Sequence, residues 1–234
     1  MLSVEWRANY SPSRMTATQH STLNTQRSLF ITGTDTGVGK THVTALVVRA
    51  LRAKGIDCVG MKPICCGERA DAEELHAACD RAIPLNDVNP VWLRTPAAPY
   101  TAAIIENRAI DLALIREVFA RLRAEHPSLI VEGVGGWRVP IARDFFISDL
   151  AAEFALPVAV VVANKLGAIN HALLTIESIQ ARGLECAGVI FNHVTSAVDD
   201  IAAITNRGML EDILGVPVLH EIAHGQQTLE LAKA

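Results

Sequence analysis

The sequence predicts an α/β protein in which helices flank a doubly wound, mostly parallel sheet. Half of the 234 residues are apolar and only 5% are aromatic, which is typical of aliphatic strands buried on both faces. Short apolar runs alternate with segments of helical periodicity along the chain, which favours consecutive βα units. The first apolar run, Leu29 to Thr32, leads directly into a glycine-rich turn that ends in Lys40-Thr41.

The expected elements follow from these runs and from the residues that end them. The helix after the turn is expected over 41–54, because Gly55 can adopt the left-handed conformation that closes a helix. The second strand, over 58–62, stops at Pro63. A proline-bearing stretch over 84–101 is expected to be an irregular loop, and long loops of this kind are usually functional. The other expected elements are helices over 71–80, 111–125 and 168–181, strands over 129–132, 157–163 and 187–192, and a final helix with a strand near 216–219.

The chain is expected to consist of a polar tail, 1–27, and a single domain, 28–234. The tail lacks the apolar core of a signal peptide. We expect it to be disordered, or translation to begin at Met15; an organellar presequence is a further alternative because of Arg7, Arg14 and Arg27. A net charge of −4 without a basic run makes nucleic acid and anionic membranes unlikely partners on electrostatic grounds. No apolar run approaches the roughly 20 residues of a membrane span. Five cysteines without a C-x-x-C pair indicate a reduced, cytoplasmic protein.

Residues 33–41, Gly-Thr-Asp-Thr-Gly-Val-Gly-Lys-Thr, have the pattern of a nucleoside-triphosphate phosphate loop. Backbone N–H groups of such a P-loop, together with the N-terminus of the next helix, bind phosphate oxygens. Lys40 is expected to reach the β- and γ-phosphates, and the Thr41 hydroxyl to bind Mg²⁺. Five residues separate Gly33 from Gly39 where the common loop has about four, which favours a synthetase branch of P-loop proteins. The nucleotide-binding residues predicted here are Asp35, Thr36, Gly37, Val38, Gly39, Lys40, Thr41 and His42.

Charged residues at the ends of two further strands predict a metal and phosphate site, because ligands of such sheets bind outside the carboxyl ends of the strands. Glu132 follows the buried run 129–131, and a Mg²⁺ site needs one or two protein carboxylates. Lys62 ends the second strand, where a fixed ammonium could stabilise a transferring phosphoryl group. Asp71 is either a further metal ligand or an acid that merely favours a helix start.

Taken in order, these motifs resemble the dethiobiotin synthetase family. The matching segments are 33–41, Lys62-Pro63 with Gly67, Glu132-Gly-Val-Gly-Gly-Trp137 with Pro140, and Lys165-Leu-Gly-Ala-Ile-Asn-His171. The resemblance runs from about 28 to 221 and implies an ATP- and Mg²⁺-dependent ring closure. In that reaction 7,8-diaminononanoate takes up CO₂ as a carbamate, the carbamate attacks the γ-phosphate, and the second amine closes a cyclic urea.

The resemblance also implies roles for individual residues. Lys62 would hold the carbamate oxygen, Thr36 would bond at the phosphate–substrate junction, and Asn192 would read the adenine edge. The implied catalytic residues are Lys40, Lys62 and Thr36, and the implied Mg²⁺ ligands are Thr41, Asp71 and Glu132. The implied substrate-binding residues are Lys62, Cys66, Pro99, Gly135, Leu166, Gly167 and Asn170. The last three would bind the substrate's tail carboxylate from the other subunit of a homodimer.

Three positions depart from the family pattern. Cys66 stands where serine is usual, Tyr100 stands where histidine is common, and Leu219–Ala223 replaces a Gly-Glu-Ile-Pro motif. A cobyrinate-type amide ligase remains an alternative, although it normally needs a glutaminase domain that this length does not accommodate. A P-loop switch ATPase of the partition or septum-site type is a second alternative, although its additional early lysine is missing around Asp35. A degenerate relative that only binds nucleotide is a third.

Overall fold

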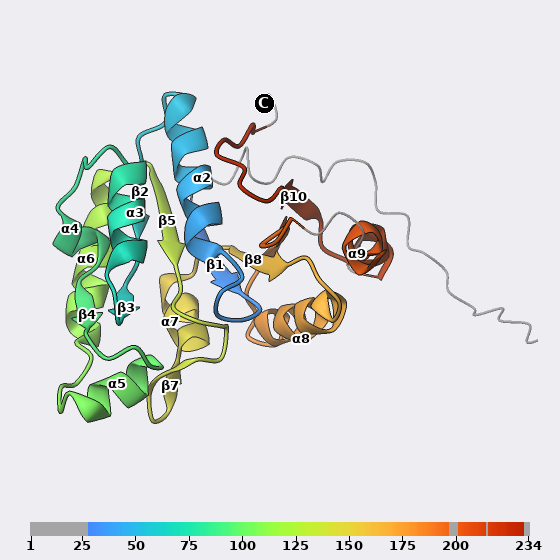
Figure 1. The fold of residues 1–234 in the computed structure, drawn as a ribbon. Helices are drawn as coiled ribbons and strands as arrows, with labels where there is room; N and C mark the ends of the chain where they lie inside the picture. The colour runs from blue at the N-terminus through green and yellow to red at the C-terminus, as the bar shows by residue number, and fades with distance from the viewer. Residues whose placement is uncertain (1–27, 197–200, 214, 232–234) are drawn as a thin grey trace, which may run out of the picture.

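A six-stranded sheet forms the centre of the protein in the computed structural model, which describes residues 28–196, 201–213 and 215–231. The predicted tail, 1–27, lies outside these residues. Every neighbouring pair of strands in this sheet is parallel, so the predicted fold class is confirmed (Figure 1). In spatial order the strands are β2 (Cys58–Met61), β5 (Ser128–Glu132), β1 (Leu29–Gly33), β8 (Val158–Ala163), β9 (Cys186–Asn192) and β10 (Val218–Ile222).

Helices flank this sheet along its whole width. α2 (Lys40–Ala53) packs against β1, β5 and β2, and α8 (Ala168–Gln180) packs against β8 and β9. Figure 1 shows α2 and α3 beside the β1–β5–β2 half of the molecule and α8 and α9 beside the other half. The bounds of the remaining longer helices are α3 (Ala70–Ala78), α6 (Leu112–Glu125), α7 (Ile147–Phe154) and α9 (Ile201–Ile213).

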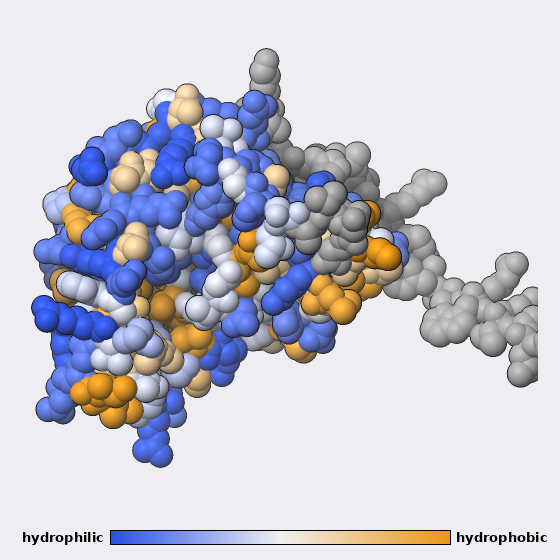
Figure 2. All heavy atoms as spheres, viewed as in Figure 1, coloured by the Kyte–Doolittle hydropathy of each residue, from blue (hydrophilic) through white to orange (hydrophobic). Residues whose placement is uncertain are grey.

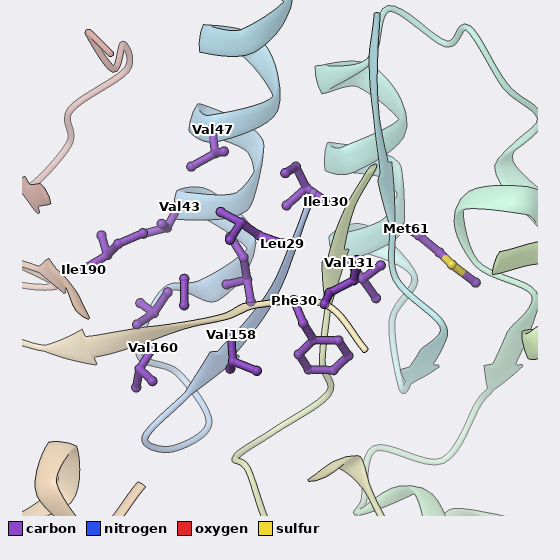
Figure 3. Close-up of a cluster of buried hydrophobic side chains, with 14 of the residues drawn as sticks. Leu29, Phe30, Val43, Val47, Met61, Ile130, Val131, Val158, Val160 and Ile190 are labelled. Atoms are coloured by element: carbon purple, nitrogen blue, oxygen red, sulfur yellow. The ribbon is translucent and has the colours of Figure 1, made fainter. Parts of the chain in front are cut away.

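The core lies on the central strands. All residues of β1, β2, β5 and β8 are buried, as expected of parallel strands covered on both faces. Figure 3 shows Phe30, Val131 and Val158 side by side on three adjacent strands, with Val43 of α2 pointing toward Ile190 of β9. Continuous apolar runs, rather than alternating ones, therefore identified these strands in the sequence.

The stretch over 84–101 is more regular than expected, and its prediction as an irregular loop is wrong. It contains α4 (Leu85–Val88), β4 (Val91–Leu93) and the start of α5 (Pro99–Ile105). β4 pairs in parallel with β3 (Ile64–Cys66), which follows β2. Each of these elements is too short to establish a period in the sequence, and long-range pairing defines them instead.

Residues 133–157 also contain elements that the sequence did not indicate. An antiparallel pair, β6 (Pro140–Ala142) and β7 (Phe145–Phe146), leads into α7. Phe154 of α7 stacks on Phe119 of α6 with ring centroids 3.8 Å apart, and no local pattern predicts such a contact. The final strand is Val218–Ile222 rather than 216–219. The other expected strands and helices agree with the structure within two residues at either end.

Several large apolar side chains are exposed on α5, α8 and α9. Figure 2 shows hydrophobic groups on the surface near α5 and around α8 and α9. The exposed side chains on these helices are Ile104, Ile105, Leu174, Ile201, Ile204, Met209 and Ile213. Across the described ranges, no helix combines the length and the apolar character needed to cross a membrane.

The strand order places a crevice at the carboxyl end of β1. β1 lies between β5 and β8, so the chain builds the sheet outward in both directions from this strand. Loops that follow adjacent strands separate where the winding direction reverses, and ligands of α/β sheets bind in the resulting crevice.

Candidate active site

The loop after β1, residues 34–39, has the backbone of a phosphate-binding turn. Gly37 and Gly39 adopt left-handed conformations with φ of 75° and 85°, and α2 begins at Lys40. A Cβ atom on Gly39 would come within 2.1 Å of Nδ2 of Asn192, whereas nothing lies within 4 Å of one on Gly37. Glycine at position 39 is therefore required by both conformation and space. The free N–H groups at the start of α2 suit an anion.

Lys40 is buried at the start of α2. Its Nζ donates to the main-chain oxygen of Asp35 at 2.8 Å, and only 6% of the residue is exposed. Burial, and then the nearby charge of Lys62, lower the pKa of Lys40 to about 8. A phosphate group beside this ammonium would raise that pKa again, because an opposite charge favours the protonated form.

Thr41, Lys62, Asp71 and Glu132 meet at the carboxyl ends of β2 and β5. The Thr41 hydroxyl donates to Oε1 of Glu132 at 2.9 Å, and Nζ of Lys62 donates to the same oxygen. Nζ of Lys62 also lies 3.1 Å from Oδ2 of Asp71 and 3.3 Å from the main-chain oxygen of Gly133. The structure thus brings together the predicted metal ligands and the predicted carbamate lysine.

Opposite charges in this cluster keep each other ionised. Burial favours the neutral amine, but the carboxylates of Glu132 and Asp71 outweigh it and raise the pKa of Lys62 above its ordinary value. Burial likewise favours neutral Asp71, but Lys62 outweighs it and lowers the pKa of that carboxyl. Lys62 is 2% exposed and Glu132 is fully buried. Removing one partner would therefore leave an unpaired buried charge, which is strongly destabilising.

The residues present also fit a magnesium ion. Oε2 of Glu132 is buried and has no hydrogen-bond partner within the described residues, and a cation would satisfy such an oxygen. The Thr41 hydroxyl and the half-exposed Asp71 carboxylate lie beside it. The part of the chain that the structure describes holds no cluster of three or more His, Cys, Asp or Glu side chains suited to a metal. Phosphate oxygens and water would have to complete the coordination, as is usual for Mg²⁺.

An open cleft of about 770 Å³ joins the phosphate loop to this cluster. Its volume lies in the range of small-molecule sites, which is roughly 300–1,000 Å³. Residues that the sequence predicted separately as nucleotide, metal and substrate contacts therefore face one space. The predicted residues that line the cleft are Thr36, Gly37, Gly39, Lys40, Thr41, His42, Lys62, Cys66, Asp71, Pro99, Glu132 and Gly135.

Three predicted nucleotide contacts, Asp35, Val38 and Asn192, do not line the cleft. Asn192 at the end of β9 is buried, and its Nδ2 donates to the main-chain oxygen of Val38 at 2.9 Å. Oδ1 of Asp35 accepts from the main-chain N–H of Thr36 at 2.7 Å. Through these bonds Asn192 and Asp35 hold the backbone of the loop in shape.

The predicted tail-binding segment lies outside the cleft of its own chain. Gly167 is the N-cap of α8, with φ of 88°, and Leu166 before it is 84% exposed. Neither they nor Asn170 lines the cleft. Within one chain, this segment does not complete the site.

Several cleft residues were not predicted from the sequence. Glu74 lies three residues after Asp71 on α3, so helical spacing around a suspected metal ligand was the signal that could have found it. Tyr100 lines a separate hollow of about 420 Å³ with Ile104 and Ile141. The remaining cleft residues that the sequence did not single out are Cys65, Glu68, Pro96, Ala97, Ala98, Val134 and Val139.

Solved structures similar to this chain share its fold at low sequence identity. The septum site-determining protein MinD of Pyrococcus horikoshii, complexed with Mg-ADP, has a TM-score of 0.54 at 18% identity, covering 85% of this chain and 81% of that one. The signal recognition particle receptor FtsY of Elizabethkingia anophelis, in complex with GDP, has a TM-score of 0.53 at 14% identity, covering 89% and 60%. Such likeness supports the P-loop fold and does not distinguish one function from another.

Relatives found by sequence identify the family more narrowly than the solved structures do. A family model described as an AAA domain matches residues 27–228. The ATP-dependent dethiobiotin synthetase BioD of Akkermansia muciniphila is 48% identical over 205 residues, which span 88% of this chain and 96% of the relative. The enzyme of that name from Aromatoleum aromaticum is 42% identical over 206 residues, which span 85% and 91%. With this identity over nearly the full length of its relatives, the chain belongs to the family of ATP-dependent dethiobiotin synthetases.

Proposed function

We propose that this protein makes dethiobiotin from 7,8-diaminononanoate, CO₂ and ATP, with Mg²⁺ as its metal ion. The position of Lys62 carries the proposal. Its ammonium is held between Glu132 and Asp71 and faces the same cleft as the phosphate loop. A carbamate formed beside it and a phosphoryl group transferred to that carbamate would both meet fixed positive charge.

The first step is the formation of the carbamate. One substrate amine bonds to the carbon of CO₂ and loses a proton, which leaves an anion that needs a cation. Lys62 stays protonated because the two neighbouring carboxylates raise its pKa. It therefore serves as a charge stabiliser and not as a general base. Cys66 and Pro99 line the same cleft and would contact the diamine.

The second step is phosphoryl transfer, which depends mainly on positioning and on neutralising charge. An oxygen of the carbamate bonds to the γ-phosphorus and ADP leaves. Lys40 would neutralise the β- and γ-phosphates, and Thr36 would hold the junction of phosphate and substrate. Bound by Thr41, Asp71 and Glu132, Mg²⁺ would supply further positive charge at the phosphates. The second amine then bonds to the activated carbon, loses a proton and expels phosphate.

A homodimer is the proposed working form of the enzyme. The free N–H groups at the start of α8 suit a carboxylate, but they lie outside the cleft of their own chain. Leu166 and Leu174 nearby are exposed apolar side chains, which supports a contact with a second copy. In that dimer, each α8 would bind the substrate tail of the partner's site.

We further propose that residues 28–234 act as one synthetase domain in the cytoplasm. One continuous hydrophobic core spans the described strands and helices. All five cysteines are free thiols, which suits a reducing compartment. Asn192 would in addition present its remaining side-chain oxygen toward the adenine base.

The decisive experiment supplies purified protein with diamine, bicarbonate, Mg²⁺ and ATP. Dethiobiotin is followed by mass spectrometry, and phosphate release is followed in parallel. We expect product only when all four components are present. Lys62→Met should lose at least about a hundredfold in kcat, as for a misplaced or missing positioning charge. Lys54→Met, at the exposed C-cap of α2, should not.

Two outcomes would contradict the proposal. ATP hydrolysis without dethiobiotin would indicate a switch ATPase or a different amine substrate. Bound nucleotide without any turnover would indicate a relative that has lost catalysis. Full activity of Lys62→Met would leave the reaction in place but remove Lys62 from it.

A further inference from the structure

The main chain of Lys62 is held by the segment 85–89 and not by the central sheet. Its N–H donates to the main-chain oxygen of Val88 at 2.7 Å. Its C=O accepts from Nδ2 of Asn89 at 2.8 Å. Both backbone groups of this lysine therefore bond to the end of α4, while its ammonium bonds to the carboxylates across the cleft.

Asn89 is buried, and its side-chain amide makes three hydrogen bonds, which form a hub between Lys62 and Arg69. The residue is 1% exposed, and the same Nδ2 that bonds to Lys62 also donates to the main-chain oxygen of Val91 at 2.9 Å. Oδ1 of Asn89 accepts from Nε of Arg69 at 2.9 Å. A buried amide with all these bonds made is rigid, and losing any one of them exposes an unpaired group.

Arg69 connects this hub to Asp71. Its Nη2 donates to the main-chain oxygen of Asn89 at 2.8 Å and to Oδ1 of Asn86 at 2.9 Å. The guanidinium is therefore hydrogen-bonded to the end of α4 at several points. The main-chain oxygen of Arg69 accepts from the N–H of Glu73 at 3.1 Å, in the first turn of α3. Asp71 lies in that turn, two residues from the anchored arginine.

We propose that Asn89 and Arg69 are positioning residues that set the distance between Lys62 and Asp71. Asn89 fixes the main chain under Lys62, and Arg69 fixes the helix start that presents Asp71. Neither side chain lines the cleft, so both act through those two residues. The consequence for catalysis rests on the role proposed above for Lys62.

The planar fork of arginine explains the residue type. Its Nε and Nη groups donate to a side-chain oxygen and a main-chain oxygen of Asn89 at fixed angles, which a lysine ammonium cannot reproduce. An Arg69→Lys variant keeps the charge and loses the fork. It therefore separates geometry from charge.

The test compares Arg69→Met and Arg69→Lys with Arg52→Met. Arg52 is a matched control because its Nη1 donates at 3.1 Å to the main-chain oxygen of Cys58, at the opposite end of β2. We expect kcat for dethiobiotin to fall at least about tenfold in Arg69→Met, because small misplacements of catalytic groups are costly. We expect a smaller fall in Arg69→Lys and less than a twofold change in Arg52→Met.

Two readouts distinguish positioning from loss of structure. The dissociation constant of metal-free ADP should stay within about twofold in all variants, because the phosphate loop does not contact Arg69 or Asn89. The ¹⁵N-edited NMR signal of the Lys62 ammonium, assigned by its loss in Lys62→Met, should shift or broaden in the Arg69 variants and stay unchanged in Arg52→Met. This signal also tests the hub if the wild-type protein makes no dethiobiotin.

Asn89→Asp provides an independent variant if Arg69→Met does not fold. A carboxylate keeps the pairing with Arg69 but cannot donate to Lys62, so the same fall in kcat and the same NMR change are expected. Wild-type kcat in Arg69→Met, or an unchanged Lys62 signal in both the Arg69 and Asn89 variants, would overturn the proposal.

Discussion

At the scale of single residues, the charge of Lys40 depends on pH. With its pKa lowered to about 8, the ammonium is present below pH 8 and is lost as the pH rises through that value before nucleotide binds. Bound phosphates raise the pKa again, so nucleotide binding above pH 8 must take up a proton. We expect the affinity for ADP or an ATP analogue to fall by up to about tenfold per pH unit above pH 8. Isothermal titration calorimetry in two buffers of different ionisation enthalpy measures both the affinity and the proton uptake.

Lys40→Arg is the matched control for that titration. Its guanidinium keeps its charge at all these pH values, so the affinity should no longer depend on pH between 8 and 9. A Lys40→Arg protein with the wild-type pH profile would assign the titration to another group.

Cys66 is the departure from the family pattern that faces the cleft. Burial, and then the charge of Glu106, raise the pKa of this thiol to about 11, so it is a neutral and weak donor at physiological pH. A serine hydroxyl donates better, by about 1 kcal/mol. We therefore expect Cys66→Ser to raise kcat/KM for the diamine about fivefold, measured by dethiobiotin formation.

Cys186→Ser is the control for this substitution. Burial raises the pKa of Cys186 to about 11 as well, but this residue lies at the start of β9 and outside the cleft. Its variant should have wild-type kinetics. If Cys66→Ser also has wild-type kinetics, the thiol takes no part in placing the carbamate.

At the scale of elements, substitutions in the turn between β1 and α2 test whether Asn192, at the end of β9, supports the phosphate loop. Gly37→Ala meets no neighbouring atom, so it should cost only the strain of a left-handed alanine, about 1–2 kcal/mol. Gly39→Ala meets Nδ2 of Asn192 and must also displace the bond from Asn192 to the loop. We expect Gly39→Ala to be clearly less stable in urea unfolding and to lose nucleotide affinity that Gly37→Ala keeps. Equal losses in the two variants would show that Asn192 does not support the loop.

The elements that could be predicted from the sequence are those with a strong local signal. β1, β5 and β8 are continuous apolar runs. α2 follows a loop whose glycine pattern predicts a phosphate-binding turn at the start of a helix. β3, β4 and α7 could not be predicted, because partners distant in sequence define them. For α7, that partner is Phe119 of α6, which stacks on Phe154.

The same division applies to the site. The phosphate loop is contiguous, so its residues could be predicted together. The ends of two buried strands indicated Lys62 and Glu132, and the resemblance to a family decided in favour of Asp71 as a metal ligand. The hydrogen bonds among these three depend on the spatial order of β2 and β5, which no spacing in the sequence gives. Asn89 lay in a stretch predicted to be irregular, so its bond to Lys62 could be found only in the structure.

For the whole molecule, the fold alone leaves the function open. Solved P-loop structures such as MinD share the sheet at 18% identity, and the switch ATPase alternative would have the same architecture. The distinction comes from the cleft, where the Lys62 cluster faces the phosphate loop, and from relatives at 48% identity. The proposed dimer adds a feature that one chain cannot supply, because α8 lies outside the cleft of its own chain.

Mixed dimers test whether each site uses residues from both chains. Gly167→Asp places a negative charge at the start of α8, where it should repel the substrate carboxylate, and aspartate tolerates the left-handed conformation found there. Lys62→Met disables the other half of the site. If the sites are shared, a hybrid dimer of these two inactive variants contains one site with both defects and one intact site. Equal mixing should then restore about a quarter of wild-type activity, because half of the dimers are hybrids with one working site of two.

Gly183→Asp is the control, because it has a similar φ of 71° and lies beyond the opposite end of α8. On its own, this variant should remain active. Sedimentation velocity on each protein establishes that dimers form and exchange before the activities are compared. No recovery in exchanging dimers would place the tail-binding groups in the same chain as Lys62. Full activity of Gly167→Asp on its own would instead show that the substrate carboxylate binds away from the start of α8.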